Sequence, residues 1–170
     1  MSPPAILVMG TSGCGKSTLG RAIAADLGAT FLEGDEYHTD EARARMARGE
    51  PLTDADRWPW LDRLAAAVAD TRRDGPVVFA CSALKRSYRD RLRARLPGLV
   101  TVFPMAPRDV IAERMAERTG HYMPVSLLDS QFAALEPPEE DEAPVRVDAT
   151  LGITPMIERA VAALRDRPGV

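Results

Sequence analysis

Short apolar runs alternate with longer amphipathic stretches along the chain, and this alternation predicts strands joined by helices into a parallel sheet. The first and third runs are almost continuously apolar, as expected of central strands that are covered on both faces. The last run is short and predicts an edge strand. The predicted strands are Ala5–Met9, Thr30–Leu32, Val77–Ala80, Leu99–Phe103 and Val145–Val147.

The stretches between these runs carry the caps and stops of helices. Gly28 is a suitable stop for the first helix, and Thr39 and Thr53 are suitable N-caps. From Leu84 to Leu96 every fourth residue is apolar, which predicts an amphipathic helix with its arginines on the other faces. The acid-rich segment 136–144 is predicted to be a solvated loop. Helices are predicted at 16–27, 39–48, 53–73, 84–96, 107–118, 124–135 and 154–165.

Length and composition predict one soluble α/β domain spanning residues 1–170. Apolar residues make up 45% of the chain, and the net charge is −3, which argues against a nucleic-acid binder held by bulk positive charge. Two cysteines are too few for a disulfide framework. No signal peptide is evident, and no apolar run approaches the roughly 18 residues that span a bilayer. We therefore expect a cytoplasmic protein without a membrane partner.

The segment Gly10–Ser17 has the pattern G-x-x-x-x-G-K-[ST] between a predicted strand and a predicted helix, which is the context that a phosphate-binding loop requires. Backbone N–H groups of such a loop surround nucleotide phosphates. Lys16 is predicted to neutralise the β- and γ-phosphates of ATP, and the Ser17 hydroxyl to bind Mg²⁺. The predicted nucleotide contacts are Gly10, Thr11, Ser12, Gly13, Cys14, Gly15, Lys16, Ser17 and Thr18.

Asp35 follows the second predicted strand, at the sheet edge where ligands of open parallel sheets bind. A carboxylate there can orient a substrate hydroxyl and accept its proton during phosphoryl transfer, so Asp35 is a candidate catalytic residue together with Lys16. The alternative is that Asp35 caps a turn or reaches Mg²⁺ through water. His38 can hydrogen-bond the substrate or serve a structural role.

The third predicted strand ends in Cys81-Ser-Ala-Leu-Lys85, without the carboxylate that many phosphate-loop NTPases carry at this place. This argues against motors and helicases and favours a compact kinase whose acceptor lies here, beside Ser82. Lys85 and Arg89, one turn apart, offer cations to an anionic acceptor. The alternative for Arg89 is a solvated helix face. The chain has twenty Arg and only two Lys, Lys16 and Lys85, which draws attention to Lys85.

Arg114 and Arg118 lie four residues apart at the end of a predicted helix, before Gly120 and His121. This stretch predicts a lid, at about 118–126, whose arginines close on the ATP phosphates and exclude water. Arg118 is therefore a further candidate catalytic residue. The alternative is that both arginines are ordinary cations at a helix C-terminus.

Together these motifs make the chain resemble the gluconokinases, small phosphate-loop kinases related to shikimate and nucleoside monophosphate kinases. The resemblance covers nearly the whole chain, and its most specific parts are the Pro-Leu-x-Asp-x-Asp-Arg-x-Pro-Trp block and the Cys-Ser-Ala-Leu-Lys turn. Thr39 and Ala42 depart from the residues usual in that family. The resemblance rests on residues 8–18, 34–38, 46–61, 81–85 with 88–89, 118–121 and 130–137.

The resemblance implies ATP-dependent phosphorylation of the 6-hydroxyl of D-gluconate, giving 6-phospho-D-gluconate. It also implies a P-loop NTPase fold with strand order 2-3-1-4-5, dependence on Mg²⁺ and a cytoplasmic homodimer. It assigns to the substrate Asp35, His38, Arg57, Ser82, Lys85, Arg89 and His121, and to the lid Arg118–His121.

Two other functions remain open at this point. One is a different small-metabolite kinase such as a shikimate kinase, which shares the phosphate loop but typically has a glycine-rich end to the third strand. The other is a nucleotide-dependent switch or binding module. A GTPase switch is excluded in its usual form, because its guanine-binding Asn-Lys-x-Asp segment needs an asparagine and the chain contains none.

Overall fold

The computed structural model describes residues 2–117 and 125–170. Five strands form one parallel sheet in the order β2-β3-β1-β4-β5, which confirms the predicted strand order. The central strand β1 pairs with β3 on one side and with β4 on the other, and β5 is an edge strand as predicted. The strands are β1 (Ala5–Val8), β2 (Thr30–Glu33), β3 (Val77–Ala80), β4 (Val100–Met105) and β5 (Val145–Asp148).

The predicted helices are all present, with small differences at their ends. Both predicted N-caps are confirmed: the Thr39 side chain accepts from the backbone N–H of Ala42, and Thr53 forms a capping box with Asp56. The helices are α1 (Lys16–Leu27), α2 (Asp40–Ala47), α3 (Asp54–Thr71), α4 (Arg86–Arg95), α5 (Arg108–Glu117), α6 (Val125–Ala134) and α7 (Ile153–Arg165), with short 3₁₀ helices η1 (Gly34–Tyr37), η2 (Glu140–Glu142) and η3 (Ala149–Leu151).

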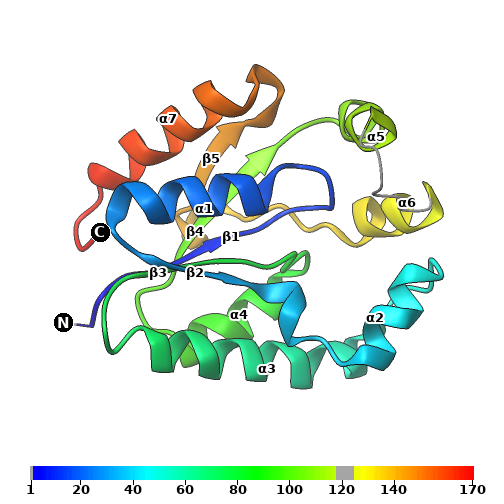
Figure 1. Ribbon diagram of the computed structural model, residues 1–170, viewed down its shortest axis with the longest axis horizontal. Helices are drawn as coiled ribbons and strands as arrows, with labels where there is room; N and C mark the ends of the chain where they lie inside the picture. The colour runs from blue at the N-terminus through cyan, green and yellow to red at the C-terminus, as the bar shows by residue number, and fades with distance from the viewer. Residues whose placement is uncertain (1, 118–124) are drawn as a thin grey trace.

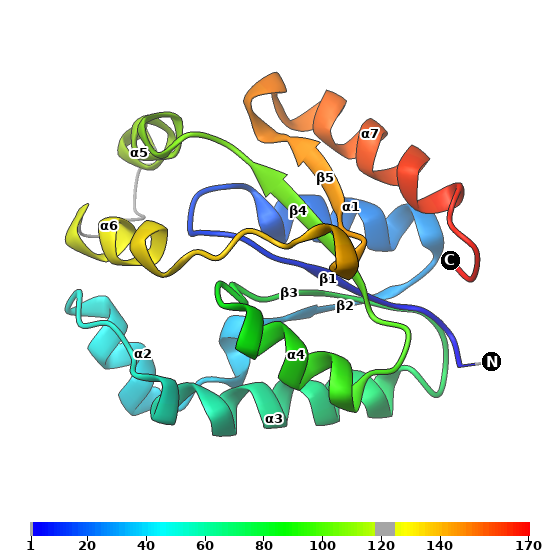
Figure 2. The ribbon, with the colours of Figure 1, turned by 180° about the vertical axis from the view of Figure 1, so that it is seen from behind.

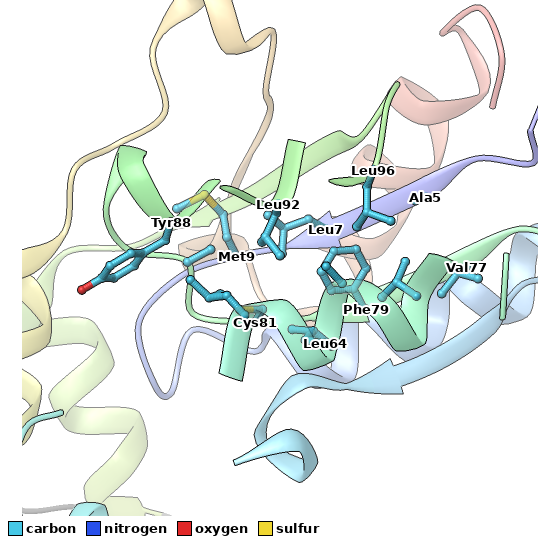
Figure 3. Packing of buried hydrophobic residues seen from close by; sticks show 14 of the residues in the cluster. Ala5, Leu7, Met9, Leu64, Val77, Phe79, Cys81, Tyr88, Leu92 and Leu96 are labelled. Atoms are coloured by element: carbon cyan, nitrogen blue, oxygen red, sulfur yellow. The ribbon is translucent and has the colours of Figure 1, made fainter. Parts of the chain in front are cut away.

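Helices cover both faces of the sheet, which explains the apolar central strands. In β1, Ala5 and Leu7 face the layer of α3 and α4, whereas Ile6 and Val8 face the layer of α1 and α7. Figure 3 shows the first of these layers, where Leu7 and Phe79 of the sheet pack with side chains of α3 and α4. The sheet is thereby fixed as a rigid platform for the loops at its edge.

The carboxyl ends of the parallel strands meet at one edge of the sheet, where α2, α5 and α6 also gather (Figure 1). The described ends of the chain lie at the opposite edge, and the view from behind shows the same arrangement (Figure 2). Within residues 2–117 and 125–170, every helix is too short or too polar to cross a membrane. The chemistry predicted from the motifs therefore converges on one end of the molecule.

Two sequence predictions are wrong in detail. The helix predicted from Leu84 begins at Arg86, because Ala83 has a left-handed backbone (φ 42°) and Lys85 an extended one, which a helix cannot include. The acid-rich segment 136–144 is not simply solvated, because its Glu142 side chain is only 1% exposed and forms ion pairs with Arg89 and Arg93. Both corrections concern the neighbourhood of the third strand's end.

Candidate active site

The phosphate loop lies between β1 and α1, and its glycines are required by its backbone and by its neighbours. Gly13 has a φ of 79° and Gly15 a φ of 87°, in the left-handed region that glycine adopts most readily. A Cβ atom on Gly13 would lie 2.7 Å from Cγ of Met115 and 3.1 Å from Cγ2 of Ile111, both on α5. There is therefore no room for a side chain at Gly13 between the loop and α5.

The two polar residues of the loop that were assigned to phosphate and metal lie at the start of α1. Lys16 lines the main cavity of the site, and its Nζ lies 3.4 Å from the carbonyl oxygen of Thr11. The Ser17 hydroxyl donates a hydrogen bond to the Glu33 carboxylate, with 2.5 Å between the oxygens. Thr18 is exposed on α1. Two hard oxygen donors, Ser17 and Glu33, thus meet at the carboxyl end of β2.

The two cysteines are buried and carry no reactive thiolate. Cys14 packs with Ile111 and Leu128, and burial raises the pKa of its thiol despite the nearby Lys16. Burial also raises the pKa of the Cys81 thiol, to about 12. Both thiols are protonated at neutral pH, so Cys14 contributes to the loop through its backbone and its packing.

A cavity of about 700 Å³ opens beside the phosphate loop, within the size range of small-molecule sites. It brings together the loop residue Lys16 and the acceptor candidates Asp35, His38, Arg57, Ser82 and Lys85. The wall between them comes from α2, α3, α4 and α6. The remaining lining residues are Ser12, Met46, Ala47, Pro51, Leu52, Thr53, Asp54, Ala55, Leu84, Tyr88, Leu127, Ser130, Gln131 and Ala134.

Asp35 is placed by the glycine before it. A Cβ atom on Gly34 would lie 2.3 Å from the carbonyl oxygen of Ala80, so only glycine lets η1 pass this close to β3. The Trp60 indole N–H donates to the Gly34 carbonyl oxygen over 2.8 Å and fixes the same turn from α3. As a result the exposed Asp35 side chain lies on the cavity, beyond the carboxyl end of β2.

His38 is held as a neutral side chain. Its ring stacks on Trp60 with 3.9 Å between the centroids, and the residue is 7% exposed. Burial lowers the pKa of His38 to about 4, and the nearby Arg57 and Arg43 add to this effect against the opposing Asp35. A neutral imidazole both donates and accepts a hydrogen bond, which suits contact with a hydroxyl group.

The acceptor end of the cavity combines cations, a carboxylate and an aromatic ring. Lys85 Nζ lies 3.1 Å from Oδ1 of Asp54, and the Tyr88 hydroxyl donates to the same carboxylate oxygen. These two hydrogen bonds hold the pKa of Asp54 below its ordinary value. The guanidinium of Arg57 lies over the Tyr88 ring, 5.6 Å from its centroid. This arrangement suits a ligand with both hydroxyl and carboxylate groups.

Comparison with known proteins agrees with this geometry. A family model described as an AAA domain matches residues 6–138. The thermosensitive gluconokinase of Escherichia coli K12 is 40% identical, with 97% of this chain and 91% of the relative covered. A gluconokinase structure from Sinorhizobium meliloti 1021 superposes with a TM-score of 0.88 at 48% identity, covering 96% of this chain and 92% of that one.

The chain belongs to the gluconokinase family. A shikimate kinase structure from Bacteroides thetaiotaomicron is more distant, with a TM-score of 0.60 at 20% identity over 96% of this chain and 97% of that one. That likeness concerns the fold alone. The gluconokinase family is therefore favoured over the shikimate kinases, in agreement with the Cys-Ser-Ala-Leu-Lys turn.

One predicted substrate contact of this gluconokinase-family chain is wrong. Arg89 is completely buried, and each of its side-chain nitrogens donates to protein: Nε and Nη2 to Glu142, and Nη1 to two backbone carbonyl oxygens. Tyr88 lines the cavity but Arg89 does not, and all side-chain nitrogens of Arg89 are used by partners inside the protein. The four-residue spacing between Lys85 and Arg89 indicated that they share a helix face, but it did not indicate that the Arg89 side chain is buried.

The predicted lid is described only in part. Arg114 is half-buried on α5, whose neighbouring Met115 lies against Gly13 of the phosphate loop. Arg118 and His121 lie outside the described residues, as does most of the segment 118–126. The position of α5 is thus compatible with a role of Arg114 at the phosphates.

Sequence reasoning missed Gln131 of α6 and Glu33 of β2. Gln131 accepts the Ser12 backbone N–H over 2.7 Å and donates to the Ser12 hydroxyl over 3.2 Å, so α6 is bonded to the phosphate loop. The stretch 130–137 was part of the family resemblance, but nothing in it indicates which helical residue faces the loop. Glu33 could have been found as the last residue of the strand before Asp35.

Proposed function

We propose that this protein transfers the γ-phosphoryl group of ATP to the 6-hydroxyl of D-gluconate, giving 6-phospho-D-gluconate and ADP. One observation carries the proposal: Lys16 of the phosphate loop and the acceptor candidates Asp35, Arg57 and Lys85 line the same cavity. Donor and acceptor can therefore be held together, and such positioning, with electrostatic stabilisation, accounts for nearly all catalysis in phosphoryl transfer. The named relatives support gluconate as the acceptor.

On the donor side, backbone N–H groups of the phosphate loop bind the phosphate oxygens at the start of α1. Those of Gly10 and Ser12 are not among them, since they donate to Ser82 and Gln131. Lys16 neutralises charge on the β- and γ-phosphates as the bond to the leaving ADP lengthens. The hydrogen bonds of Gln131 to Ser12 keep the loop in this shape from the side of α6. The loop thus enters the reaction already formed.

The residues at the carboxyl end of β2 fit Mg²⁺, which prefers oxygen ligands and keeps several of its waters. Ser17 supplies a hydroxyl for direct binding, and Glu33, hydrogen-bonded to it, supplies a carboxylate for the ion or its waters. When bound, Mg²⁺ neutralises charge on the β- and γ-phosphates.

On the acceptor side, Asp35 accepts the proton of the attacking hydroxyl, and the neutral His38 hydrogen-bonds a neighbouring hydroxyl. Lys85 and Arg57, which also line the cavity, bind the carboxylate of the acid, and Ser82 adds a hydroxyl contact. A six-carbon acid has the reactive hydroxyl and the carboxylate at opposite ends, so both groups of residues can act at once.

The lid completes the site in this proposal. Arg114, with Arg118 and His121, closes on the phosphates and keeps water from competing with the acceptor hydroxyl. We also propose, on the family resemblance, that the chain is one domain and acts as a cytoplasmic homodimer. Light scattering behind a size-exclusion column measures the mass of the assembly directly.

A panel of acceptors tests the proposed reaction. ADP release is measured with D-gluconate, other aldonates, shikimate and nucleoside monophosphates, with the Lys16→Met variant as the background control. D-gluconate is expected to exceed shikimate by about two orders of magnitude or more in kcat/KM, since a site with fixed polar groups rejects ligands that leave them unpaired. Equal rates with and without every acid would favour the switch or binding module instead, and a preference for shikimate would favour the other kinase.

A further inference from the structure

The turn that carries Ser82 and Lys85 into the cavity has an unusual backbone. Ala83, at its centre, is fully buried and has a φ of 42°, in the left-handed region that non-glycine residues avoid. The residues on either side of Ala83 and Leu84 both line the cavity. The direction of Ser82 and Lys85 therefore depends on how the turn between them is held.

Every carbonyl group of this turn from Ser82 to Leu84 accepts a hydrogen bond from elsewhere in the protein. The Ser82 oxygen accepts the backbone N–H of Gly10 over 3.2 Å, and the Leu84 oxygen accepts that of Glu136 over 2.8 Å. Arg89 Nη1 donates to the oxygens of both Ala83 and Leu84, over 3.0 and 3.2 Å. Arg89 is thus the side chain that hydrogen-bonds the carbonyl group of the left-handed residue, Ala83.

Arg89 is in turn fixed by a buried carboxylate. Its Nε and Nη2 lie 2.7 and 3.0 Å from the two oxygens of Glu142, in a bidentate pair with side chains 0% and 1% exposed. The backbone N–H of Glu139 and the guanidinium of Arg93 donate to the same carboxylate. Burial alone would raise the pKa of Glu142, but these hydrogen bonds lower it to about 2, so the pair stays ionised.

We propose that Arg89, oriented by Glu142, is a positioning residue for the acceptor site: it holds the Ala83–Leu84 backbone so that Ser82 and Lys85 face the acid. This inference rests on the proposed function, because its readout is the affinity for D-gluconate. Arg89 touches neither substrate. Its effect on the acceptor passes through the backbone of the turn.

The geometry requires arginine in particular. A guanidinium presents donors on three nitrogens in a fixed fork, so one group reaches the carboxylate and both carbonyl oxygens together. An ammonium at the same place keeps the charge but cannot span both sets of acceptors. Arg89→Lys therefore keeps a positive charge beside Glu142 but loses the hydrogen bonds that hold the turn.

The experiment compares Arg89→Lys with Arg93→Lys in the same ADP-release assay. Arg93 lies on the same helix and donates to the same carboxylate over 2.7 Å, but no hydrogen bond of its side chain reaches the turn among the described residues. Arg89→Lys is expected to raise KM for D-gluconate about tenfold and to leave KM for ATP within about twofold. Arg93→Lys is expected to change neither KM by more than about twofold.

Adding Ala83→Gly gives the second readout, because glycine adopts a left-handed φ at little cost. The double variant Arg89→Lys/Ala83→Gly is expected to recover part of the gluconate KM, whereas Ala83→Gly in the Arg93→Lys background is expected to change nothing. Glu142→Gln keeps the shape of the side chain and is expected to give the same selective rise as Arg89→Lys. It replaces Arg89→Lys in the comparison if that variant does not fold.

Three outcomes overturn the inference: equal rises in both KM values, equal effects of Arg89→Lys and Arg93→Lys, or an unchanged gluconate KM in Arg89→Lys and Glu142→Gln. Each would make the buried ion pair a purely structural element. Failure of the proposed function is a different result, since the wild-type protein would then release no ADP in response to D-gluconate, and the acceptor role of Arg89 would fall with it.

Discussion

Trp60 of α3 contacts two parts of the acceptor site: the turn that carries Asp35, and the ring of His38. Its indole N–H donates to the Gly34 carbonyl beside Asp35, and its ring stacks on His38. The residue is 1% exposed, so the contact is shielded from water on all sides. One buried side chain thereby fixes the proposed proton acceptor and a proposed hydroxyl ligand relative to each other.

The neutral state of His38 predicts a pH dependence of stability. The pKa of His38 is about 4 in the folded protein against an ordinary value of 6.5, so between these values the unfolded chain binds a proton that the folded chain does not. The free energy of unfolding should therefore fall as pH drops from 6.5 toward 4, by at most about 1.4 kcal/mol per pH unit. Urea unfolding of the wild-type protein and His38→Gln between pH 5 and 6.5 measures this slope.

The free energy of unfolding is expected to change less steeply with pH in His38→Gln than in the wild-type protein. His121→Gln, which removes the other histidine, is the comparison variant. The range above pH 5 avoids the carboxylates, which titrate lower in the unfolded chain. Identical slopes in the wild-type protein and His38→Gln would show that His38 is protonated in the folded state as easily as in the unfolded one.

At single positions, the sequence pointed to residues that belong to recognisable motifs. It did not indicate how deeply a side chain is buried in the folded protein. Lys16, Asp35, Arg57, Ser82 and Lys85 all line the observed cavity. Arg89 does not, because its partner Glu142 lies 53 residues further along the chain and local spacing carries no sign of it. A long-range ion pair of this kind becomes visible only in the folded structure.

Among the elements, η1 is the one whose position depends most on a single residue. Gly34→Ala places a Cβ atom 2.3 Å from a backbone oxygen of β3, which cannot move without disturbing the sheet. We expect a loss of stability of about 1–3 kcal/mol, as for other overpacked sites, and a fall in kcat because Asp35 shifts with η1. Thermal unfolding and the gluconate assay measure the two effects.

Gly28→Ala is the matched control for this prediction. Gly28 follows α1 with a φ of 63°, and no atom lies within 4 Å of the place that a Cβ atom would take, so its cost of about 1 kcal/mol comes from the backbone alone. Its kcat should equal that of the wild-type protein. If Gly34→Ala matched Gly28→Ala in both stability and kcat, close packing of η1 would not be what places Asp35.

Element by element, the helices and strands could be predicted because their periodicity and caps are local. The strand order could not be obtained from these patterns and came from the family resemblance. The bounds of the third strand were predicted correctly, but the start of the next helix was wrongly placed at Leu84, since an apolar residue there fits a helix as well as the buried turn that it forms. Backbone geometry set by distant hydrogen bonds leaves no mark on local composition.

Over the whole molecule, charge is arranged to bind anions in a chain that is acidic overall. The net charge is −3, yet in the cavity the three cations Lys16, Arg57 and Lys85 outnumber the two carboxylates Asp35 and Asp54. Arg89 does not belong to this group, because Glu142 compensates its charge in the interior. Attraction of two anionic substrates must therefore come from the local field of the cavity rather than from the net charge.

The central claim is that this cavity joins ATP and D-gluconate for transfer to the 6-hydroxyl, with Asp35 as proton acceptor. Phosphorus NMR of a reaction mixture containing both substrates and Mg²⁺ tests it most directly, with the wild-type protein and Asp35→Asn side by side. Glu36→Gln is the control, since Glu36 shares η1 with Asp35 but does not line the cavity.

The account predicts a phosphomonoester signal coupled to the two protons of C6, growing with the ADP signals. Asp35→Asn should slow its appearance by about 10²- to 10⁴-fold while ATP still binds, and Glu36→Gln should not. Inorganic phosphate as the sole product, or phosphate on another oxygen of the acid, would contradict the proposed reaction. A wild-type rate in Asp35→Asn would contradict the role of Asp35.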